Sequence, residues 1–469
     1  MKNKISEAIL RDKSDITDIA RRMLRRDFSG YTGIALKNSI FQLTTTLLSR
    51  LGAFLFTVLL AGDLITVKVL GFEKPLLSPE LFGLYSLTLS TIFLIGTISD
   101  IGIGNTFIRF VSWLLEKKDY KKAKLVGIYL FKMRLIFIGV SVIVLLCLSR
   151  FLAESYYKKP IYLALLAGGI YIILNGIIGI IDSSFISQNN FKFSLIKETV
   201  FQALRVFIVP IAIVYSLGYS EGVLVMSIIF ALVFCAFLSG IIAIIFNIER
   251  FAYLRTKTGK VKIDEIQKRR INKFILAIFL TSLSGMFLSY IDILFLGRFV
   301  SAESIGYYRV GISLISSAIP LIGFSSVLLP IFSRLRGNQI KKALHKSIRL
   351  MILLTIPTTI ISIIIAKDLI FLVYGRSYVS SVLIFQIFAS LILIDPIIAI
   401  YSNFHISQNR PFKVTRAILS STFVNLVLSG MFVFYLIGVG AGEYFIVLGV
   451  TLATIISKIS YLIILLKKT

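Results

Sequence analysis

About twelve long apolar stretches follow one another along the chain, separated by short polar or basic connections. An α-helix of about 20 residues crosses a hydrocarbon core of about 30 Å. The runs are continuous, without the alternation of a membrane β-strand, and a spanning segment must pair its own backbone groups, so we expect helices. The expected spans are 37–62, 82–112, 125–149, 160–186, 193–217, 222–247, 272–298, 304–332, 348–366, 379–407, 412–437 and 443–466.

The second six stretches repeat features of the first six. The segments 78–85 and 301–308 carry Ser, Glu, Gly and Tyr at matching positions, and Ile-Ser-Gln-Asn at 186–189 returns at 406–409. Chance likeness between Leu- and Ile-rich segments is the alternative explanation. Such a repeat is typical of transporters built from two like-oriented bundles around a shared cavity. We therefore expect four parts: a cytoplasmic amphipathic helix at 1–36, a six-helix bundle at 37–247, a basic cytoplasmic linker at 248–271 and a second six-helix bundle at 272–469.

Composition and charge place these bundles in a membrane. Hydrophobic residues make up 57% of the 469 residues and charged residues only 16%. In a soluble protein the net charge of +28 would indicate nucleic-acid binding. Here the Lys and Arg residues gather in alternate connections, such as 116–124 and 333–349, and the opposite connections are short and nearly neutral. This positive-inside bias predicts both termini in the cytoplasm and contact with anionic lipids. We expect a multi-pass protein of the plasma or inner membrane with no nucleic-acid partner.

The first 36 residues lack the apolar core and cleavage site of a signal peptide. Ile16, Ile19 and Met23 fall on one helical face that arginines flank, and Ser14 is a suitable N-cap. We expect an interfacial helix on the cytoplasmic leaflet. A basic tail without fixed structure is the alternative.

Several ionisable residues fall inside the expected spans, where each costs about 2.5–3.5 kcal/mol on insertion scales and is therefore a candidate functional residue. The candidate ligands for an anionic head group are Arg50, Arg205 and Arg309. Polar side chains at helical spacing beside Arg50 and Arg205, and in the expected span 412–437, must face a wet cavity or another helix. The predicted lining of such a cavity is Gln42, Thr46, Ser49, Gln202 and Asn425. The acids that could couple transport to an ion are Asp100, Asp292 and Asp395.

The arginines of the expected spans 37–62 and 193–217 have no counterpart in the second half, because Arg50 aligns with Gly285 and Arg205 with Asn425. An unrepeated cationic patch indicates a bound anion held mainly by the first half. The alternative is a buried ion pair between Arg50 and Asp100 with no ligand. For Arg134, nearer a cytoplasmic end, snorkelling to the head groups is the favoured interpretation.

Two segments of the second half resemble a known family. Tyr-Ile-Asp-Ile-Leu-Phe-Leu-Gly at 290–297 and Ser-Ala-Glu-Ser-Ile-Gly-Tyr-Tyr at 301–308 resemble the Wzx-type polysaccharide flippases of the multidrug/oligosaccharidyl-lipid/polysaccharide (MOP) exporter superfamily. The segments 81–85 and 99–104 resemble the matching first-half motifs, and the first external loop, 63–80, is longer than the family pattern. The resemblance implies an all-α, MATE-like membrane fold and a cargo of oligosaccharide on a polyprenyl (di)phosphate, flipped to the outer leaflet by alternating access. Glycan polymerases or glycosyltransferases are the partners expected of such a flippase.

Two other functional classes compete with this interpretation. An exporter of cationic drugs in the same superfamily predicts a net acidic cavity, which the mid-span arginines disfavour. A membrane enzyme is disfavoured because the chain shows no sizeable soluble domain, no metal-ligand cluster and no Walker-type loop. His345 and His405 are isolated, and Cys147 and Cys235 form no disulfide framework. We therefore expect a transporter that is not an enzyme and uses no cofactor or metal.

Overall fold

The computed structural model describes residues 30–63, 75–247, 264–322, 338–408 and 410–467, together with Leu328 and Phe332. The described residues form helices and no strands. Most of the predicted amphipathic helix, 1–36, and most of the predicted linker, 248–271, lie outside them.

The first half supplies six spans. They are α2 (Gly30–Ala61), α4 (Pro79–Gly96) continued by η1 (Thr97–Ser99) and α5 (Ile103–Glu116), α6 (Tyr120–Arg150) with the π-helix η2 (Phe151–Tyr157), α7 (Tyr162–Ser187), α8 (Lys192–Ser216) and α9 (Glu221–Ile245). α4 begins as its sequence predicts: the Ser78 hydroxyl accepts the Leu81 N–H at 3.3 Å, and Pro79 occupies the first turn.

The second half repeats this plan. It comprises α10 (Glu265–Phe299), α11 (Ala302–Ile322), α13 (Asn338–Ile364), the short α14 (Ala366–Val373) and η4 (Arg376–Tyr378), α15 (Ser381–Phe388) with α16 (Leu391–Ser407), α17 (Pro411–Gly438) and α18 (Glu443–Leu466). Eleven candidate spans are long and apolar enough to cross a membrane among the described residues. α11 takes the position of the remaining expected span, and its continuation beyond Ile322 lies outside the described residues. The chain is a multi-pass membrane protein.

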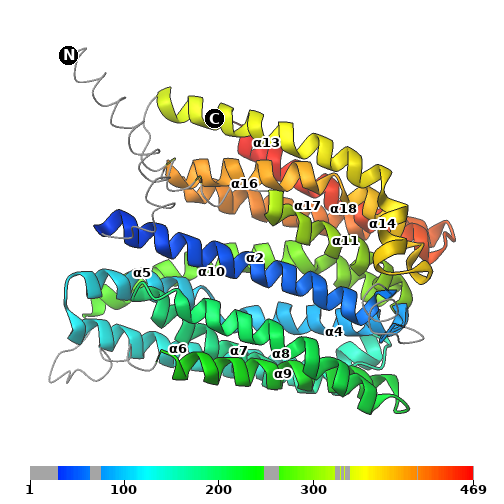
Figure 1. Ribbon diagram of the computed structural model, residues 1–469, viewed down its shortest axis with the longest axis horizontal. Helices are drawn as coiled ribbons and strands as arrows, with labels where there is room; N and C mark the ends of the chain where they lie inside the picture. Colours follow the sequence, from blue (N-terminus) through cyan, green and yellow to red (C-terminus); the bar gives the residue numbers. More distant parts are fainter. Residues whose placement is uncertain are drawn as a thin grey trace.

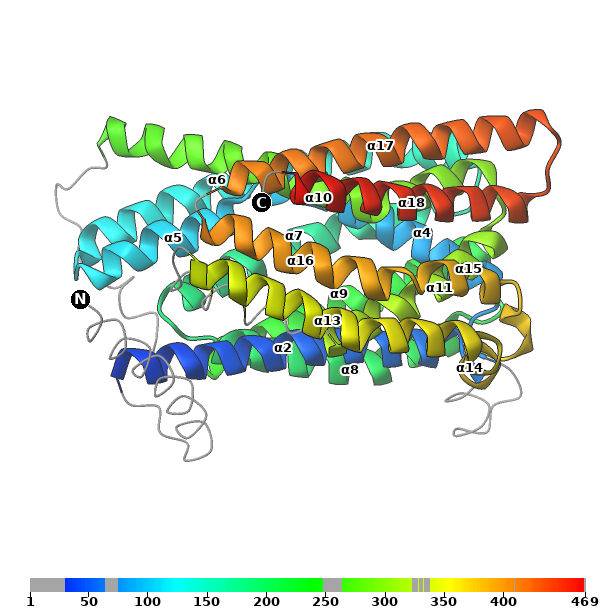
Figure 2. The same cartoon turned by 90° about the horizontal axis from the view of Figure 1, so that it is seen from above.

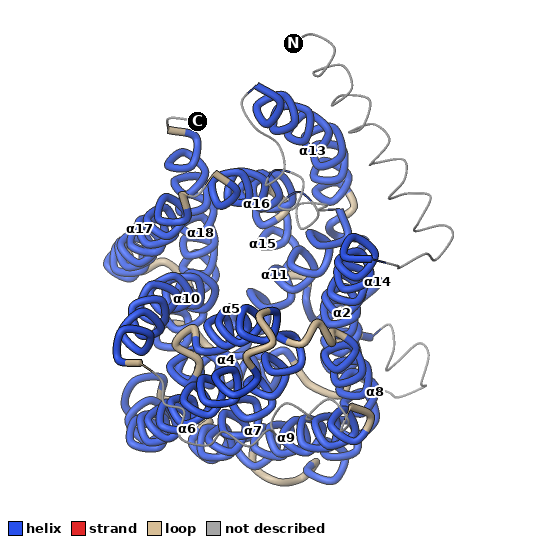
Figure 3. Tube along the Cα trace, turned by 90° about the vertical axis from the view of Figure 1, so that its left-hand side faces the viewer, coloured by secondary structure: helices blue, strands red, loops and turns tan. Residues whose placement is uncertain are grey.

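The helices form two groups with shared central members. In Figure 1, α6–α9 lie below and α13–α18 above, with α2, α4, α10 and α11 between them. Figure 2 shows α10 with α17 on one side and α2 with α8 on the other. The main contact between the halves joins α4 to α11, near the centre of the end-on view in Figure 3. α2 begins and α18 ends toward the same end of the molecule, as an even number of crossings requires.

The second span, expected as one helix over 82–112, is broken in the middle. Ile101 has φ +42° and Gly102 has φ +75°, both in the left-handed region, which a β-branched residue rarely adopts. Asp100 ends the first part, and its Oδ1 accepts the Gly104 N–H at 3.1 Å to cap α5. Irregular backbone at membrane depth persists only where protein or water supplies partners, and transporters place such breaks beside their binding sites.

At the predicted external end, α4 and α11 touch through two glycines that the repeat relates. A Cβ built on Gly83 would lie 1.8 Å from the Ala302 carbonyl oxygen, and one built on Gly306 would lie 2.2 Å from that of Pro79. Only glycine allows two backbones this close. The repeated Gly of segments 78–85 and 301–308 therefore closes this end of the molecule.

At the same end, one basic side chain from each half bonds to backbone carbonyl oxygens of the other half. Lys159 Nζ donates to the carbonyl oxygens of Gly297 at 2.7 Å and Val300 at 2.8 Å, where α10 ends. Arg298 of α10 donates in return to the carbonyl oxygen of Tyr156 at 2.8 Å, where η2 ends. Each cation meets the unpaired carbonyls and negative dipole of a helix C-terminus. This reciprocal pair holds the two halves together at the predicted external end.

Candidate functional site

A cavity of about 410 Å³ lies among the helices of the first half, and residues of the second half complete its wall. Five first-half helices line it: α2, α4, α7, α8 and α9. Of the described residues in the second half, only Tyr290 of α10 and Arg309 of α11 reach it. Three of the arginines singled out from the sequence, Arg50, Arg205 and Arg309, line this one cavity.

Arg205 is the most unusual of these side chains. It is 8% exposed, and its Nε and Nη2 are buried without a hydrogen-bond partner among the described residues. Its guanidinium lies over the Phe56 ring at 4.4 Å and is 5.5 Å from the Phe201 ring centre. The rings stabilise the charge but leave the donors unused. A buried cation with free donors is costly unless a ligand supplies acceptors.

Arg50 and Arg309 complete a cationic wall. Arg50 is exposed and Arg309 is partly buried. Neither forms an ion pair or hydrogen bond with another described residue. Glu198 is the one acid that lines the cavity within the described chain, and its carboxylate accepts from the Gln202 amide. Nearby Lys197 is already neutralised by Asp182 at 3.2 Å. The cavity therefore carries an excess of positive charge.

A second cavity, of about 520 Å³, adjoins the first and shares Phe93, Tyr171 and Asn175 with it. Asp100 lines it and forms an ion pair with Arg134, whose side chain is 8% exposed. The alternative pairing of Arg50 with Asp100 is therefore wrong. The snorkelling expected of Arg134 is wrong too, because the break in the second span places a carboxylate within its reach.

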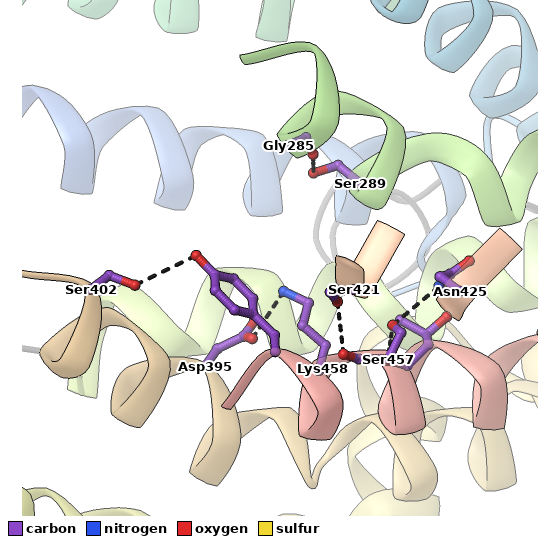
Figure 4. Close-up of polar contacts among 10 residues, drawn as sticks. Gly285, Ser289, Asp395, Ser402, Ser421, Asn425, Ser457 and Lys458 are labelled. Atoms are coloured by element: carbon purple, nitrogen blue, oxygen red, sulfur yellow. Dashed lines mark hydrogen bonds and ion pairs between the residues drawn. The ribbon is translucent and has the colours of Figure 1, made fainter. Parts of the chain in front are cut away.

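Some of the predicted lining residues reach the arginine cavity and others do not. Ser49 and Gln202 line the arginine cavity, whereas Gln42 and Thr46 lie exposed on α2 and do not. Asn425 does not line it either: it is fully buried between α17 and α18, where its amide donates to Ser457 at 3.4 Å. Figure 4 shows this contact in a run of polar pairs along α16–α18. A polar stripe needs a polar partner, and here α18 supplies it in place of water.

The predicted coupling acids lie in three different surroundings. Asp100 faces the second cavity. Asp395 pairs with Lys458 at 2.9 Å (Figure 4) and lines neither cavity. Asp292 is 3% exposed and accepts hydrogen bonds from the hydroxyls of Tyr308 at 2.8 Å and Thr454 at 2.6 Å. Ion coupling through any of them stays a prediction.

Sequence reasoning missed the aromatic and amide part of the site. Tyr85, Tyr171 and Tyr290 line the arginine cavity, and Asn175 lines both cavities. Asn175 interrupts the apolar run 163–181, which is a usable signal. The tyrosines gave none, because Tyr is common in the apolar parts of this chain.

A family model described as "Polysaccharide biosynthesis protein" matches residues 75–383, which is more than half of the chain. The chain belongs to this polysaccharide biosynthesis protein family. No significantly similar sequence was found among curated proteins. The matched residues include both motif segments of the second half and those of the first, so the MOP-exporter resemblance predicted from them is confirmed.

Solved structures of MOP exporters share the fold. A multidrug resistance MATE family transporter of the MOP superfamily, inward-facing, gives a TM-score of 0.64 at 14% identity, over 90% of this chain and 93% of that one. The lipid II flippase MurJ, in an inward closed conformation, gives 0.62 at 17% identity, over 90% and 87%. The predicted MATE-like fold is confirmed.

A third solved structure, in an outward-facing conformation, also shares the fold. An outward-facing MATE family transporter of the MOP superfamily gives a TM-score of 0.56 at 15% identity, over 92% of this chain and 94% of that one. This is lower than the 0.64 of the inward-facing structure. Both comparisons show the same fold.

Proposed function

We propose that this family member flips an oligosaccharide linked to a polyprenyl (di)phosphate from the cytoplasmic to the outer leaflet of the plasma or inner membrane, by alternating access, for assembly of cell-surface polysaccharide. The observation that carries the proposal is the set of three arginines, unpaired within the described chain, in one cavity. Guanidinium forks match phosphate oxygens and stay protonated, so they bind such a head group better than a neutral one.

The rest of the cavity suits the same cargo. Ser49, Gln202 and Asn175 offer hydrogen bonds that replace water around sugar hydroxyls, each of which would otherwise cost several kcal/mol to bury. The apolar tail can stay in lipid. Because the cytoplasm is negative, moving an anionic head outward is favourable by about 2.3 kcal/mol per charge per 100 mV, provided the protein's own charges do not cross the field.

The test is flipping in proteoliposomes. A fluorescent, short-tailed prenyl diphosphate disaccharide is reconstituted with the full chain, and its exposure to an impermeant quencher is followed. Loss of one charge-assisted contact is worth about 1.5–3 kcal/mol, so Arg205→Gln should slow flipping at least about tenfold. Arg205→Lys should keep part of the rate, because an ammonium lacks the fork.

Arg150→Gln is the matched control, since the Arg150 side chain is 77% exposed at a helix end and, among the residues that the structure describes, pairs only with Glu154. It should flip at the wild-type rate. Full activity of both Arg50→Gln and Arg205→Gln at equal protein density would refute the phosphate anchor. Export of organic cations with no response to the prenyl diphosphate would instead assign the chain to the cation exporters.

A further inference from the structure

The two adjoining cavities differ in charge. The first is cationic through Arg50, Arg205 and Arg309. In the second, the Asp100 carboxylate and the Arg134 guanidinium neutralise each other. A ligand that fills both must therefore carry its negative charge at one end and be neutral but polar at the other.

We propose that the second cavity is a subsite for a neutral, hydroxyl-rich sugar, the one bonded directly to the phosphate that the arginines hold. This inference rests on the proposed function and adds to it the residues that contact the first sugar of the glycan. The common wall of Phe93, Tyr171 and Asn175 makes the two cavities neighbours, as a phosphate and its attached sugar require.

Asp100 is placed to accept hydrogen bonds from the sugar. Its Oδ1 accepts from Arg134 and from the Gly104 N–H, which fixes the carboxylate. Arg134 is fixed in turn, because its Nε donates to the Gly176 carbonyl oxygen at 3.2 Å. The Asp100 side chain remains 43% exposed, and Oδ2 has no hydrogen bond to a described residue. A rigid carboxylate with one free oxygen suits a sugar hydroxyl or an acetamido N–H.

The remaining walls suit a pyranose ring. The Phe93 ring lies 5.9 Å from that of Tyr171 and 6.0 Å from that of Tyr290, centre to centre, so an aromatic cluster lies where the two cavities adjoin. Such a cluster offers flat apolar surface to the C–H face of a sugar. On α10, Ser289 donates to the Gly285 carbonyl oxygen at 2.8 Å, so its oxygen is left to accept.

Gly285 makes the subsite testable by steric block. It lines the second cavity, and a Cβ built on it would meet no atom within 4 Å. A larger side chain there starts from open space beside the cavity and should fill the space of the sugar. Gly139 is the matched control, since its Cβ would also meet nothing within 4 Å, but it lies exposed on α6 and lines neither cavity.

The experiment measures binding of two probes to the purified full chain in nanodiscs: bare neryl diphosphate, and neryl diphosphate carrying one glucose, galactose or N-acetylglucosamine. Asp100→Asn and Gly285→Leu should each weaken the best glycosylated probe about tenfold relative to bare neryl diphosphate, and Gly285→Leu should leave the affinity for bare neryl diphosphate within about twofold. Gly139→Leu should change neither. Melting temperatures verify folding, which matters most for Asp100→Asn because it removes the partner of Arg134.

The outcomes separate the subsite from the anchor. If Arg205→Gln weakens both probes but Asp100→Asn and Gly285→Leu affect both equally or neither, the subsite is overturned and the proposed function stands. The subsite is also overturned if no glycosylated probe binds more tightly than bare neryl diphosphate. If neither probe binds the wild type, or Arg205→Gln changes neither affinity, the proposed function itself fails.

Discussion

The close contact of α4 and α11 leads to a sharp prediction about the transport cycle. In Gly83→Ala the new methyl group would lie 1.8 Å from the Ala302 carbonyl oxygen. A carbon and a carbonyl oxygen need about 3.3 Å, so the two helices must separate locally by about 1.5 Å. Gly306→Ala strains the same contact from the other side, because its Cβ would lie 2.2 Å from the Pro79 oxygen.

The forced separation of α4 and α11 raises the free energy only of the state that is closed at the predicted external end. Overpacking of this kind costs about 1–3 kcal/mol. A shift of about 2 kcal/mol changes the ratio of open to closed molecules by a factor of about 30. We therefore expect Gly83→Ala to populate the externally open state far more than the wild type does.

Thiol labelling measures this population. A reporter, Ser49→Cys in the wall of the arginine cavity, is placed in a chain with Cys147→Ser and Cys235→Ala, and a membrane-impermeant reagent is added outside. While opening and closing are fast, the labelling rate follows the open fraction. Where open molecules are a small minority in both proteins, this rate should rise about 30-fold in Gly83→Ala, and it should rise less as the open state approaches the majority. Gly139→Ala, whose Cβ meets nothing within 4 Å, should leave the rate unchanged.

The reasoning is refuted if Gly83→Ala and Gly306→Ala both fold with the wild-type melting temperature and label from outside at the wild-type rate. In that case the glycines would not set the closed state, and the reciprocal contacts of Lys159 and Arg298 would be left as its main support.

Two further predictions concern the polar contacts of the second half. Asp292→Ala leaves the buried Tyr308 hydroxyl without its acceptor and should lower the free energy of unfolding by about 2 kcal/mol, measured by denaturant titration in mixed micelles. An unchanged value would show that the hydroxyl finds another partner. Lys458→Met leaves a partly buried Asp395 carboxylate unpaired and should destabilise the protein by about 2 kcal/mol, below the roughly 3–5 of a fully buried pair. Adding Asp395→Asn should recover most of the loss, and a double variant no more stable than the single one would contradict this.

The spans and the clustering of the arginines could be predicted because each depends on local chemistry. An apolar run of about 20 residues has few alternatives to a membrane helix. Arg50 and Arg205 have few stable surroundings at mid-span other than a polar cavity, and the repeat showed that no structural counterpart exists in the second half. The structure places both, with Arg309, on the wall of one cavity.

The failures come from the partners of polar residues, which a single helix does not reveal. Asn425 and Gln202 each belong to a row of polar side chains along one face of a helix. Asn425 contacts Ser457 on α18, whereas Gln202 lines the cavity. The position of Arg134 near the end of an expected span favours snorkelling to the head groups. Its true partner, Asp100, is brought close by a helix break whose sequence signal is only a pair of nearby glycines, Gly102 and Gly104.

The most direct test of the central claim is a structure of the full chain with a bound prenyl diphosphate. A phosphate oxygen should lie within hydrogen-bond distance of Arg205 Nε or Nη2, the two donors that have no partner among the described residues, with Arg50 or Arg309 on its other side. A head group bound elsewhere, with Arg205 still unpaired, would contradict the claim that these arginines hold an anionic cargo.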